Sequence, residues 1–444
     1  MAARLLRWLA HAVTHLFYAV DRAGSPPATG AVLLLPNHAN ALLDPPIVWT
    51  SAGRDVRFLA KSTLFHGPFA PVLKAAGAIP VYRRIDEGAD PSRNAETFDA
   101  VDRALAAGEV ICLFPEGVSH STGRLEPLRT GAARMALAAE RRGVAVRLVA
   151  VGLNFDRKTV FRSRVTVVFG RPFGARDLVD ADGSAAVKLL TSRIANEMRR
   201  LLVEIDPGLD EHMVARVERL YASARGEAQD PEARLTRRRT IAAAIRKLRT
   251  TDPERLLDLG ARLDRYDRRM RRFGLSDSHL DWDVSTRAAL AFTIREGLAA
   301  ILLAPLALAG LALFWIPYSI TDGLARRVAT GQDVTATAKV LIGGTVYALW
   351  ITLIVAAAAW WLGMRAALLI AATLPLAAIA ARYAIERETA VLDTISAWLA
   401  LRRARNPTRS RLRSTRSDLA ELLDRVSESL SAETNGRAAA KTRH

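Results

Sequence analysis

Short apolar runs alternate with amphipathic helical patterns between positions 25 and 205. Apolar runs that we interpret as strands occupy residues 31–35, 56–60, 78–82, 110–114, 146–153 and 164–170. Helical patterns lie between them at residues 45–51, 68–76, 95–107, 131–141 and 185–203. This order predicts an α/β domain over residues 25–205, built on a mixed central sheet that is flanked by helices.

The chain on either side of this domain has a different pattern. In residues 1–24, Arg4 and Arg7 precede a short uncharged stretch that no small-residue cleavage site follows. This pattern indicates an amphipathic helix at a membrane interface rather than a signal peptide. Residues 206–292 mix Arg with Asp and Glu throughout, which favours solvated helices. We interpret this charged helical segment as a link between the α/β domain and a membrane.

Two uncharged runs, residues 297–320 and 340–364, each exceed the ~20 residues that a helix needs to cross a bilayer. A third run, residues 366–381, is shorter and contains Pro375. The sequence therefore predicts a transmembrane region over residues 293–385, with two or three apolar helices.

The tail, residues 386–444, is basic and combines a helical part with an end that we expect to be disordered from Ser431 onward. The positive-inside rule places such a tail in the cytoplasm. If the α/β domain is cytoplasmic too, the number of full spans is even. We therefore favour two full spans with a re-entrant or interfacial third run, in an integral membrane protein whose α/β domain lies on the cytoplasmic face.

The formal net charge of +18 over 444 residues favours an anionic partner, either a membrane surface or a nucleic acid. We expect no nucleic-acid partner, because the basic residues are spread over helices beside the apolar runs and few aromatic residues lie among them. The single cysteine, Cys112, lies within an apolar run, so we expect it to pack in the core rather than form a disulfide or a Cys-rich metal site.

A histidine and a carboxylate follow the first apolar run closely. His38 and Asp44 are six positions apart, so in a regular helix their side chains would point about 120° away from each other. They can meet if His38 lies on an irregular loop. Asp44-Pro45 predicts such a loop, since Asp is a favoured N-cap and Pro a favoured first helical residue. His38 is then a candidate general base that Asp44 orients, whereas the simpler interpretation is a loop histidine and a helix cap.

A second group of polar residues follows the apolar run at 110–114. Glu116 comes directly after it, at the edge where ligands bind in open α/β sheets, and Gly117 permits a close approach to the backbone. Arg129 lies just ahead of a predicted helix, where its side chain and the first backbone N–H groups form a candidate phosphate site. Arg83 is a second candidate anion contact, although a solvated surface arginine is the commoner case.

Three short motifs occur in order along the chain: Asn-His…Asp at 37–44, Gly-x-Ile-Pro-Val-x-Arg at 77–83, and Phe-Pro-Glu-Gly-x-Ser at 114–119. They resemble the first three motifs of the glycerolipid acyltransferase superfamily, the enzymes that make lysophosphatidate and phosphatidate. A weaker fourth match lies at residues 149–154. The resemblance covers roughly residues 25–175.

The spelling of these motifs departs from the usual pattern of the superfamily. Five residues separate His38 from Asp44 instead of four, and Ala150 stands where the fourth motif usually has Pro. The spellings His-Ala-Asn-x-x-x-Asp and Phe-Pro-Glu-Gly-x-Ser-His are similar to a branch that contains fungal-type glycerol-3-phosphate acyltransferases. Members of that branch also carry membrane helices after the catalytic domain.

The resemblance implies direct acyl transfer from a thioester to a hydroxyl of glycerol-3-phosphate or 1-acyl-glycerol-3-phosphate, in phosphatidate and phospholipid biosynthesis. His38 would take the hydroxyl proton and Asp44 would hold the imidazole tautomer. The donor would be acyl-CoA or acyl carrier protein, membrane lipid would be a further partner, and no metal or cofactor is expected. The residues implied to bind the substrate are Arg83, Glu116, Gly117, Ser119 and Arg129.

Other classes of protein fit the sequence less well. A serine hydrolase needs a Gly-x-Ser-x-Gly elbow, and the segment from Gly117 to Ser121 lacks the final glycine. The histidines are too scattered for a zinc hydrolase, although His120 is either a turn residue or a second active-site group. The main alternative is a non-catalytic membrane adaptor built on a lapsed acyltransferase fold.

Overall fold

The computed structural model describes residues 2–66, 70–83, 90–120, 122–204, 211–227, 230–272, 277–281, 312–328, 332–374 and 410–425, together with several single positions. The chain divides into two compact units. The first comprises Met1–Val214, Asp230–Ala242 and Ala329–Thr337, and the second comprises the remainder. The first unit contains the α/β fold expected from the sequence.

A seven-stranded sheet forms the centre of the first unit in the described part of the chain, with the order β1-β7-β6-β2-β5-β3-β4. Neighbouring strands are parallel except β6 and β7, so the sheet is mixed, as predicted. Each of the six predicted strands is present within two residues at either end. The strands are β1 Tyr18–Ala23, β2 Val32–Pro36, β3 Val56–Lys61, β4 Ile79–Val81, β5 Val110–Cys112, β6 Arg147–Phe155 and β7 Ser163–Phe169.

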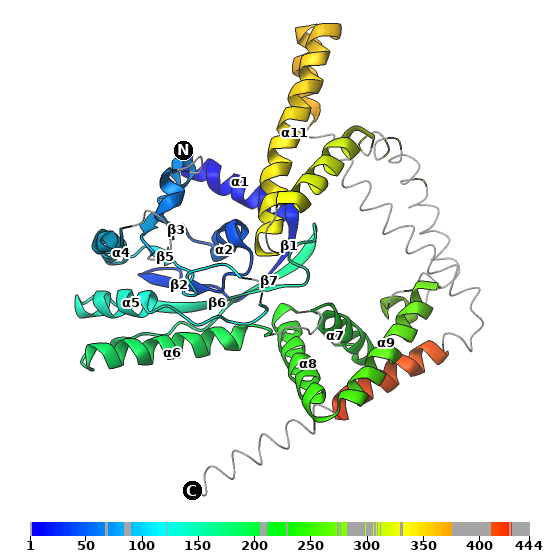
Figure 1. Cartoon of the computed structure of the whole chain (residues 1–444), viewed down its shortest axis with the longest axis horizontal. Coiled ribbons are helices and arrows are strands. Elements are labelled where there is room, and N and C mark those ends of the chain that lie inside the picture. The colour runs from blue at the N-terminus through cyan, green and yellow to red at the C-terminus, as the bar shows by residue number, and fades with distance from the viewer. Residues whose placement is uncertain are drawn as a thin grey trace, which may run out of the picture. The chain divides into compact units, whose positions relative to one another are not determined.

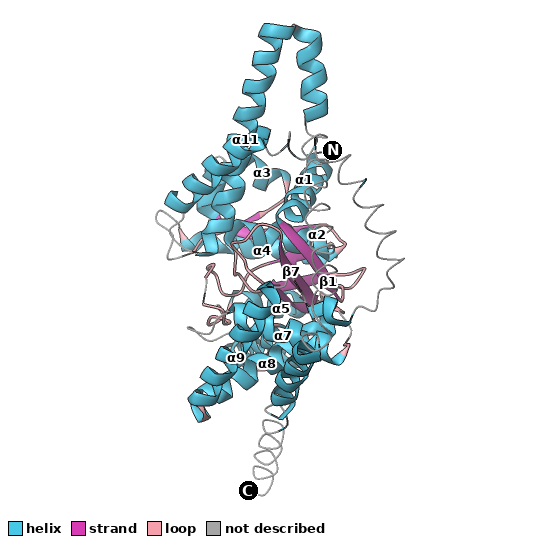
Figure 2. Ribbon diagram, turned by 90° about the vertical axis from the view of Figure 1, so that its right-hand side faces the viewer, coloured by secondary structure: helices cyan, strands magenta, loops and turns pink. Residues whose placement is uncertain are grey.

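Helices cover both faces of this sheet (Figures 1 and 2). Helices α4, α5 and α6 pack side by side on one face, and α1 and α2 pack together on the other. Their bounds are α1 Ala2–Phe17, α2 Asp44–Ala52, α3 Ala70–Ala75, α4 Asn94–Ala106, α5 Gly131–Arg141 and α6 Gly183–Leu201. Each of α2 to α6 lies where the sequence predicts a helix.

Alternating side chains of the central strands build a core on both faces of the sheet. In β2, Leu33 and Leu35 belong to the core beneath α4, α5 and α6, and Val32 and Leu34 are equally buried on the other side. A sheet that is covered on both faces requires continuous apolar strands, which is why the apolar runs located these strands so well. Cys112 in β5 is fully buried, which confirms its predicted place in the core.

The N-terminal segment differs from its prediction. Helix α1 is amphipathic and exposes Leu5 and Trp8. However, Tyr18–Ala23 is strand β1, so the prediction of helix through residue 24 is wrong. Strand β1 pairs in parallel with β7, and this pairing satisfies the backbone groups that a helix would satisfy locally. The partner strand lies far along the chain, so the local pattern does not reveal it.

The charged segment after the α/β domain is helical, as predicted, in its described part. It contains α7 Glu211–Arg225, α8 Pro231–Thr251 and α9 Pro253–Arg272. The expectation of solvated faces is wrong for the first half of α8, where Arg234 and Arg238 are buried within the first unit. They donate hydrogen bonds of 2.8 and 2.6 Å to the two carboxylate oxygens of Asp156. A buried guanidinium is stable with such a partner and costly without one.

Among the described residues, one helix segment is long and apolar enough to cross a membrane. It is Thr337–Leu362, the greater part of α11 (Gln332–Leu362), and it coincides with the second predicted span. The third predicted run is helical over Met364–Leu374, and its remainder lies outside the described residues. Part of the first predicted span, residues 297–320, also lies outside them, while its last residues, 312–320, are helical. The tail from Ser431 lies outside the described residues, whereas residues 410–425 of the tail are helical.

Candidate active site

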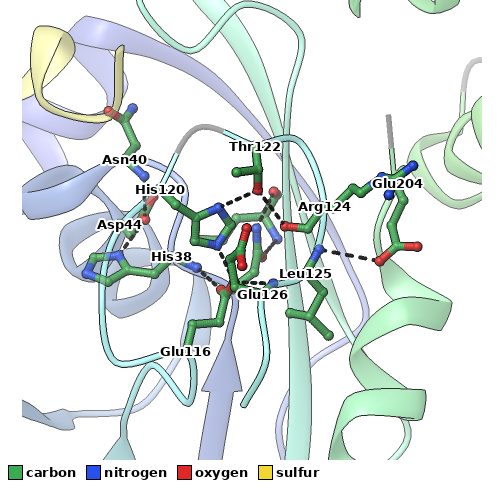
Figure 3. A network of polar contacts seen from close by, with 12 residues as sticks. His38, Asn40, Asp44, Glu116, His120, Thr122, Arg124, Leu125, Glu126 and Glu204 are labelled. Atoms are coloured by element: carbon green, nitrogen blue, oxygen red, sulfur yellow. Dashed lines mark hydrogen bonds and ion pairs between the residues drawn. The ribbon is translucent and has the colours of Figure 1, made fainter. Parts of the chain in front are cut away.

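His38 lies on the loop that follows β2, at the edge of the sheet where this strand ends (Figure 3). Its Nδ1 donates a 2.9 Å hydrogen bond to Oδ2 of Asp44. Asp44 is fully buried, while the side chain of His38 is 18% exposed and stacks on the ring of Phe114. The two side chains therefore meet as predicted, and Nε2 is the ring nitrogen that can exchange a proton with a substrate.

A tight turn brings His38 and Asp44 together across the five residues between them. Ala41–Leu43 form a 3-10 turn, and Ala41 has a φ of +38°, in the left-handed region that costs a residue with a Cβ roughly 1–2 kcal/mol. Helix α2 then begins at Asp44, one residue earlier than expected, and its carboxylate does not cap the helix. Oδ2 accepts a second hydrogen bond, of 2.8 Å, from the backbone N–H of Asn40. The carboxylate thus holds both the imidazole and the turn.

Glu116, beyond the end of β5, is directed at the loop of His38 rather than at solvent. Its side chain is fully buried. Oε1 accepts a 2.7 Å hydrogen bond from the backbone N–H of His38, and Oε2 accepts one of 2.9 Å from the backbone N–H of Glu126. In these contacts the carboxylate holds the loop of His38, whereas the resemblance implies that Glu116 binds the substrate.

His120 lies four residues after Glu116, on the segment that follows β5, and joins the same hydrogen-bond network (Figure 3). Its Nε2 lies against Oε2 of Glu116, and its backbone N–H donates a 3.1 Å hydrogen bond to the carbonyl oxygen of His38. Burial lowers the pKa of His120, but the hydrogen bond and charge of Glu116 outweigh it and raise the pKa above its ordinary value. Of the two interpretations of His120, its place beside the loop of His38 favours a group of the candidate site.

Two candidate phosphate ligands converge on Gly117. The guanidinium of Arg83 donates to the carbonyl oxygen of Gly117. A Cβ at position 117 would lie 3.3 Å from Cγ of Arg129, and the φ of +78° at this position is one that glycine adopts without strain. The turn therefore places Arg83 and Arg129, which are distant along the chain, around one backbone segment. Ser119 lies half-buried two residues further along.

Sequence reasoning missed the polar residues that fix the loop of His38. The buried side chain of Asn37 exchanges two hydrogen bonds with the backbone of Leu153 in β6, of 3.2 and 2.7 Å. Asn40 is fully buried and donates from its side chain to the hydroxyl of Tyr18, whose pKa is raised by burial. The signal in the sequence was the pair of asparagines flanking the histidine, which are too polar for a buried segment unless both are bonded.

The arrangement suits removal of a proton from a hydroxyl group on an anionic molecule. An oriented imidazole can accept the proton, the carboxylate of Asp44 stabilises the imidazolium that forms, and two guanidinium groups lie near one turn of the same site. Within the described residues, no group of three or more His, Cys, Asp or Glu side chains could hold a metal ion.

Comparisons with known families match two separate regions of the chain. Residues 19–153 match the family model described as Acyltransferase. Residues 213–434, half of the chain, match the model described as Glycerol-3-phosphate acyltransferase 2 C-terminal domain. The first region contains all the site residues described above except Tyr18, and the second contains the charged helices and the apolar segments.

Individual proteins match the chain at low sequence identity. The chain is 27% identical over 260 residues to Glycerol-3-phosphate O-acyltransferase 1 of Saccharomyces cerevisiae. This match covers 54% of this chain and 34% of the yeast protein. The chain is also 27% identical over 191 residues to Glycerol-3-phosphate O-acyltransferase 2 of the same yeast, covering 41% and 25%. The matched region is thus about a third or less of these relatives' own length. The solved 1-acyl-sn-glycerophosphate acyltransferase of Thermotoga maritima aligns with a TM-score of 0.33 at 16% identity, over 45% of this chain and 79% of that one.

Proposed function

The chain belongs to the glycerol-3-phosphate acyltransferase family, with an acyltransferase domain followed by a glycerol-3-phosphate acyltransferase 2 C-terminal domain, and we propose that it acylates a glycerol phosphate in phospholipid synthesis. The observation that carries this proposal is the 2.9 Å hydrogen bond between His38 and the buried Asp44 beside Gly117 and its two arginines. A lapsed enzyme has no need to keep such a buried, strained arrangement.

In the proposed reaction, Nε2 of His38 takes the proton of an acceptor hydroxyl as the hydroxyl oxygen attacks the thioester carbonyl. The carbon–sulfur bond then breaks, and the thiolate leaves with the proton returned by the imidazolium. Asp44 holds Nδ1–H throughout, so the same nitrogen accepts and returns the proton. The reaction balances without an acyl-enzyme intermediate, and the thioester is a co-substrate rather than a cofactor.

Arg83 and Arg129 are the groups we assign to the phosphate of the acceptor. Guanidinium groups match phosphate oxygens in geometry and charge. We assign Glu116 to positioning His38, because its buried carboxylate already accepts hydrogen bonds from the protein. Gly117 presents its carbonyl to Arg83, which orients that side chain, and Ser119 is left as a candidate contact to the acceptor.

The names of the relatives favour glycerol-3-phosphate as the acceptor over its 1-acyl derivative. Both molecules offer a phosphate and a free hydroxyl, so the polar site described above serves either one. We propose acyl-CoA or an acyl carrier protein as the donor, since both carry the acyl group as the thioester that the proposed reaction consumes.

We place the protein in a membrane, as an integral protein with the catalytic domain on the cytoplasmic face. The apolar helix Thr337–Leu362 supports this, because Trp360 and Trp361 at its end are 86% and 82% exposed. Tryptophan is enriched where a membrane helix leaves the hydrocarbon core. The basic tail supports the orientation by the positive-inside rule.

The test of this function is acyl transfer in membranes that contain the full chain. Labelled acyl-CoA is offered with glycerol-3-phosphate or with 1-acyl-glycerol-3-phosphate, to the wild type, to His38→Ala and to the matched control His66→Ala, whose side chain is exposed. Loss of a general base removes about 10²–10⁴ in rate, while the control keeps wild-type activity.

Each outcome of this test has a distinct meaning. Product from one acceptor, abolished in His38→Ala alone, identifies both the reaction and the base. Activity that survives His38→Ala refutes the proposed mechanism. Failure of the wild type to transfer from either acyl-CoA or acyl carrier protein to either acceptor favours the membrane adaptor.

A further inference from the structure

The geometry points to His120 as a positioning residue that acts as an imidazolium ion, holding Glu116 and, through it, the backbone of the general base His38. This inference rests on the proposed acyl transfer and goes beyond it. It assigns a second histidine to the reaction in a role that involves no contact with the substrate.

The contacts among these three residues form a closed ring. The backbone N–H of His38 donates to Oε1 of Glu116 at 2.7 Å, and Oε2 of Glu116 accepts from Nε2 of His120. The backbone N–H of His120 donates a hydrogen bond to the carbonyl oxygen of His38 at 3.1 Å, which closes the ring. Both backbone polar groups of His38 are therefore held by the pair Glu116–His120. A change at His120 is transmitted to the catalytic loop through these two links.

The imidazolium form of His120 allows each hydrogen bond found around its ring to form at the same time. With both ring nitrogens protonated, Nε2–H donates to Glu116 and Nδ1–H donates to Oγ1 of Thr122, 3.0 Å away. The hydroxyl of Thr122 can then donate to the carbonyl oxygen of Arg124 at 3.3 Å. When Nδ1 loses its proton, the hydroxyl of Thr122 turns to donate to the ring, and its hydrogen bond to the carbonyl oxygen of Arg124 is lost.

The charges that face His120 favour the same state. Burial opposes the imidazolium, and the ammonium of Lys158 opposes it as well, but the carboxylates of Glu116 and Glu126 outweigh both. Since these groups raise the pKa of His120, the cation persists above the ordinary value of about 6.5 and is lost as the pH rises further. Deprotonation removes the positive charge that His120 places against the buried carboxylate of Glu116.

The kinetic consequence falls on kcat rather than on KM. Displacing a catalytic group by about 1 Å can cost ~10²-fold in rate, and His120 holds the loop of His38. It makes no described contact with Arg83 or Arg129, which we assign to the phosphate. We therefore expect His120→Ala to lower kcat about 10–100-fold and to leave KM for glycerol-3-phosphate within about twofold.

The variant His120→Gln separates the hydrogen bond from the charge. Its amide can donate to Glu116 as Nε2–H does, but it carries no titratable proton. We expect it to recover part of the activity lost in His120→Ala. In the wild type, deprotonation of His120 at high pH should lower kcat. We expect this fall to be absent from His120→Gln. The remainder of the pH profile should match that of the wild type.

The experiment measures kcat and KM between about pH 6 and 9.5 for the full chain in detergent micelles, with His66→Gln as the control. Thermal unfolding of each variant is recorded in parallel. A high-pH limb present in the wild type and in His66→Gln, and absent from His120→Gln, supports the inference. An identical pH profile in His120→Gln overturns it, as does a loss of activity in His120→Ala that scales with a lost melting transition.

A second readout does not depend on activity. The ring of His120 is titrated by NMR with 13Cε1-labelled histidine, and its signal is identified by its absence from His120→Gln. A pKa above 6.5 supports the imidazolium, and one at or below 6.5 overturns it. An inactive wild type with a raised pKa at His120 would refute the proposed acyl transfer and leave the charge assignment standing, so the two failures are distinguishable.

Discussion

Replacing Asp44 by asparagine tests the most specific part of the mechanism. The two side chains have nearly the same shape, and asparagine can still accept the hydrogen bond from the backbone N–H of Asn40 through its carbonyl oxygen. What it removes is the negative charge beside the ring of His38. If the amide nitrogen faces Nδ1 instead, it also imposes the wrong tautomer on the imidazole, as in other His–Asp pairs.

The magnitude follows from the distance between the two groups. Nδ1 of His38 and Oδ2 of Asp44 are 2.9 Å apart. Taking the charge centres as about 4 Å apart, the imidazolium and the carboxylate attract by ~4 kcal/mol at an effective dielectric constant of ~20. Each 1.4 kcal/mol is about a tenfold change in rate, so losing this attraction lowers kcat by roughly 10³-fold. A hydrogen bond retained by asparagine reduces the effect to roughly 10²-fold.

The assay compares kcat for glycerol-3-phosphate acylation in the wild type, in Asp44→Asn and in Asp55→Asn. Asp55 is a suitable control because its side chain is 90% exposed and its partner, Arg7, lies on the surface helix α1. We expect a full melting transition in all three proteins. A folded Asp44→Asn protein that keeps more than about a tenth of the wild-type kcat would refute this role of Asp44.

Two further substitutions probe the turn and the buried ion pair. Gly117→Ala should destabilise the protein by about 1–2 kcal/mol and raise KM for glycerol-3-phosphate, because it forces a Cβ into a φ of +78° and against Arg129. An unchanged melting temperature and KM would contradict this. Arg238→Ala should cost about 3–5 kcal/mol, since it leaves the carboxylate of Asp156 with fewer partners. Burial raises the pKa of Asp156, but Arg238 and Arg234 outweigh it and lower the pKa. The stability that the pair contributes is therefore present above about pH 4 and lost as the pH falls below it, so denaturant unfolding should show the deficit of Arg238→Ala shrinking in acid. A stability difference between wild type and Arg238→Ala that does not change with pH would contradict this role of the ion pair.

The sequence by itself determined the α/β domain and the identity of its candidate catalytic pair. Six strands were predictable because both faces of the sheet are covered, so each strand is a continuous apolar run. The meeting of His38 and Asp44 was predictable because Asp44-Pro45 indicates a helix start, which confines His38 to a loop. The apolar segment Thr337–Leu362 was equally visible, since its length and composition are local properties.

Tertiary contacts decided the features that the sequence left open or that we predicted wrongly. Tyr18–Ala23 is a strand because β7 is available to pair with it, and Arg234 and Arg238 are buried because Asp156 lies opposite them. Glu116 holds the backbone of His38 because two loops that follow β2 and β5 converge at one edge of the sheet. In each case the partner is distant along the chain, and a local pattern carries no information about which distant group will satisfy a backbone strand, a buried charge or a carboxylate.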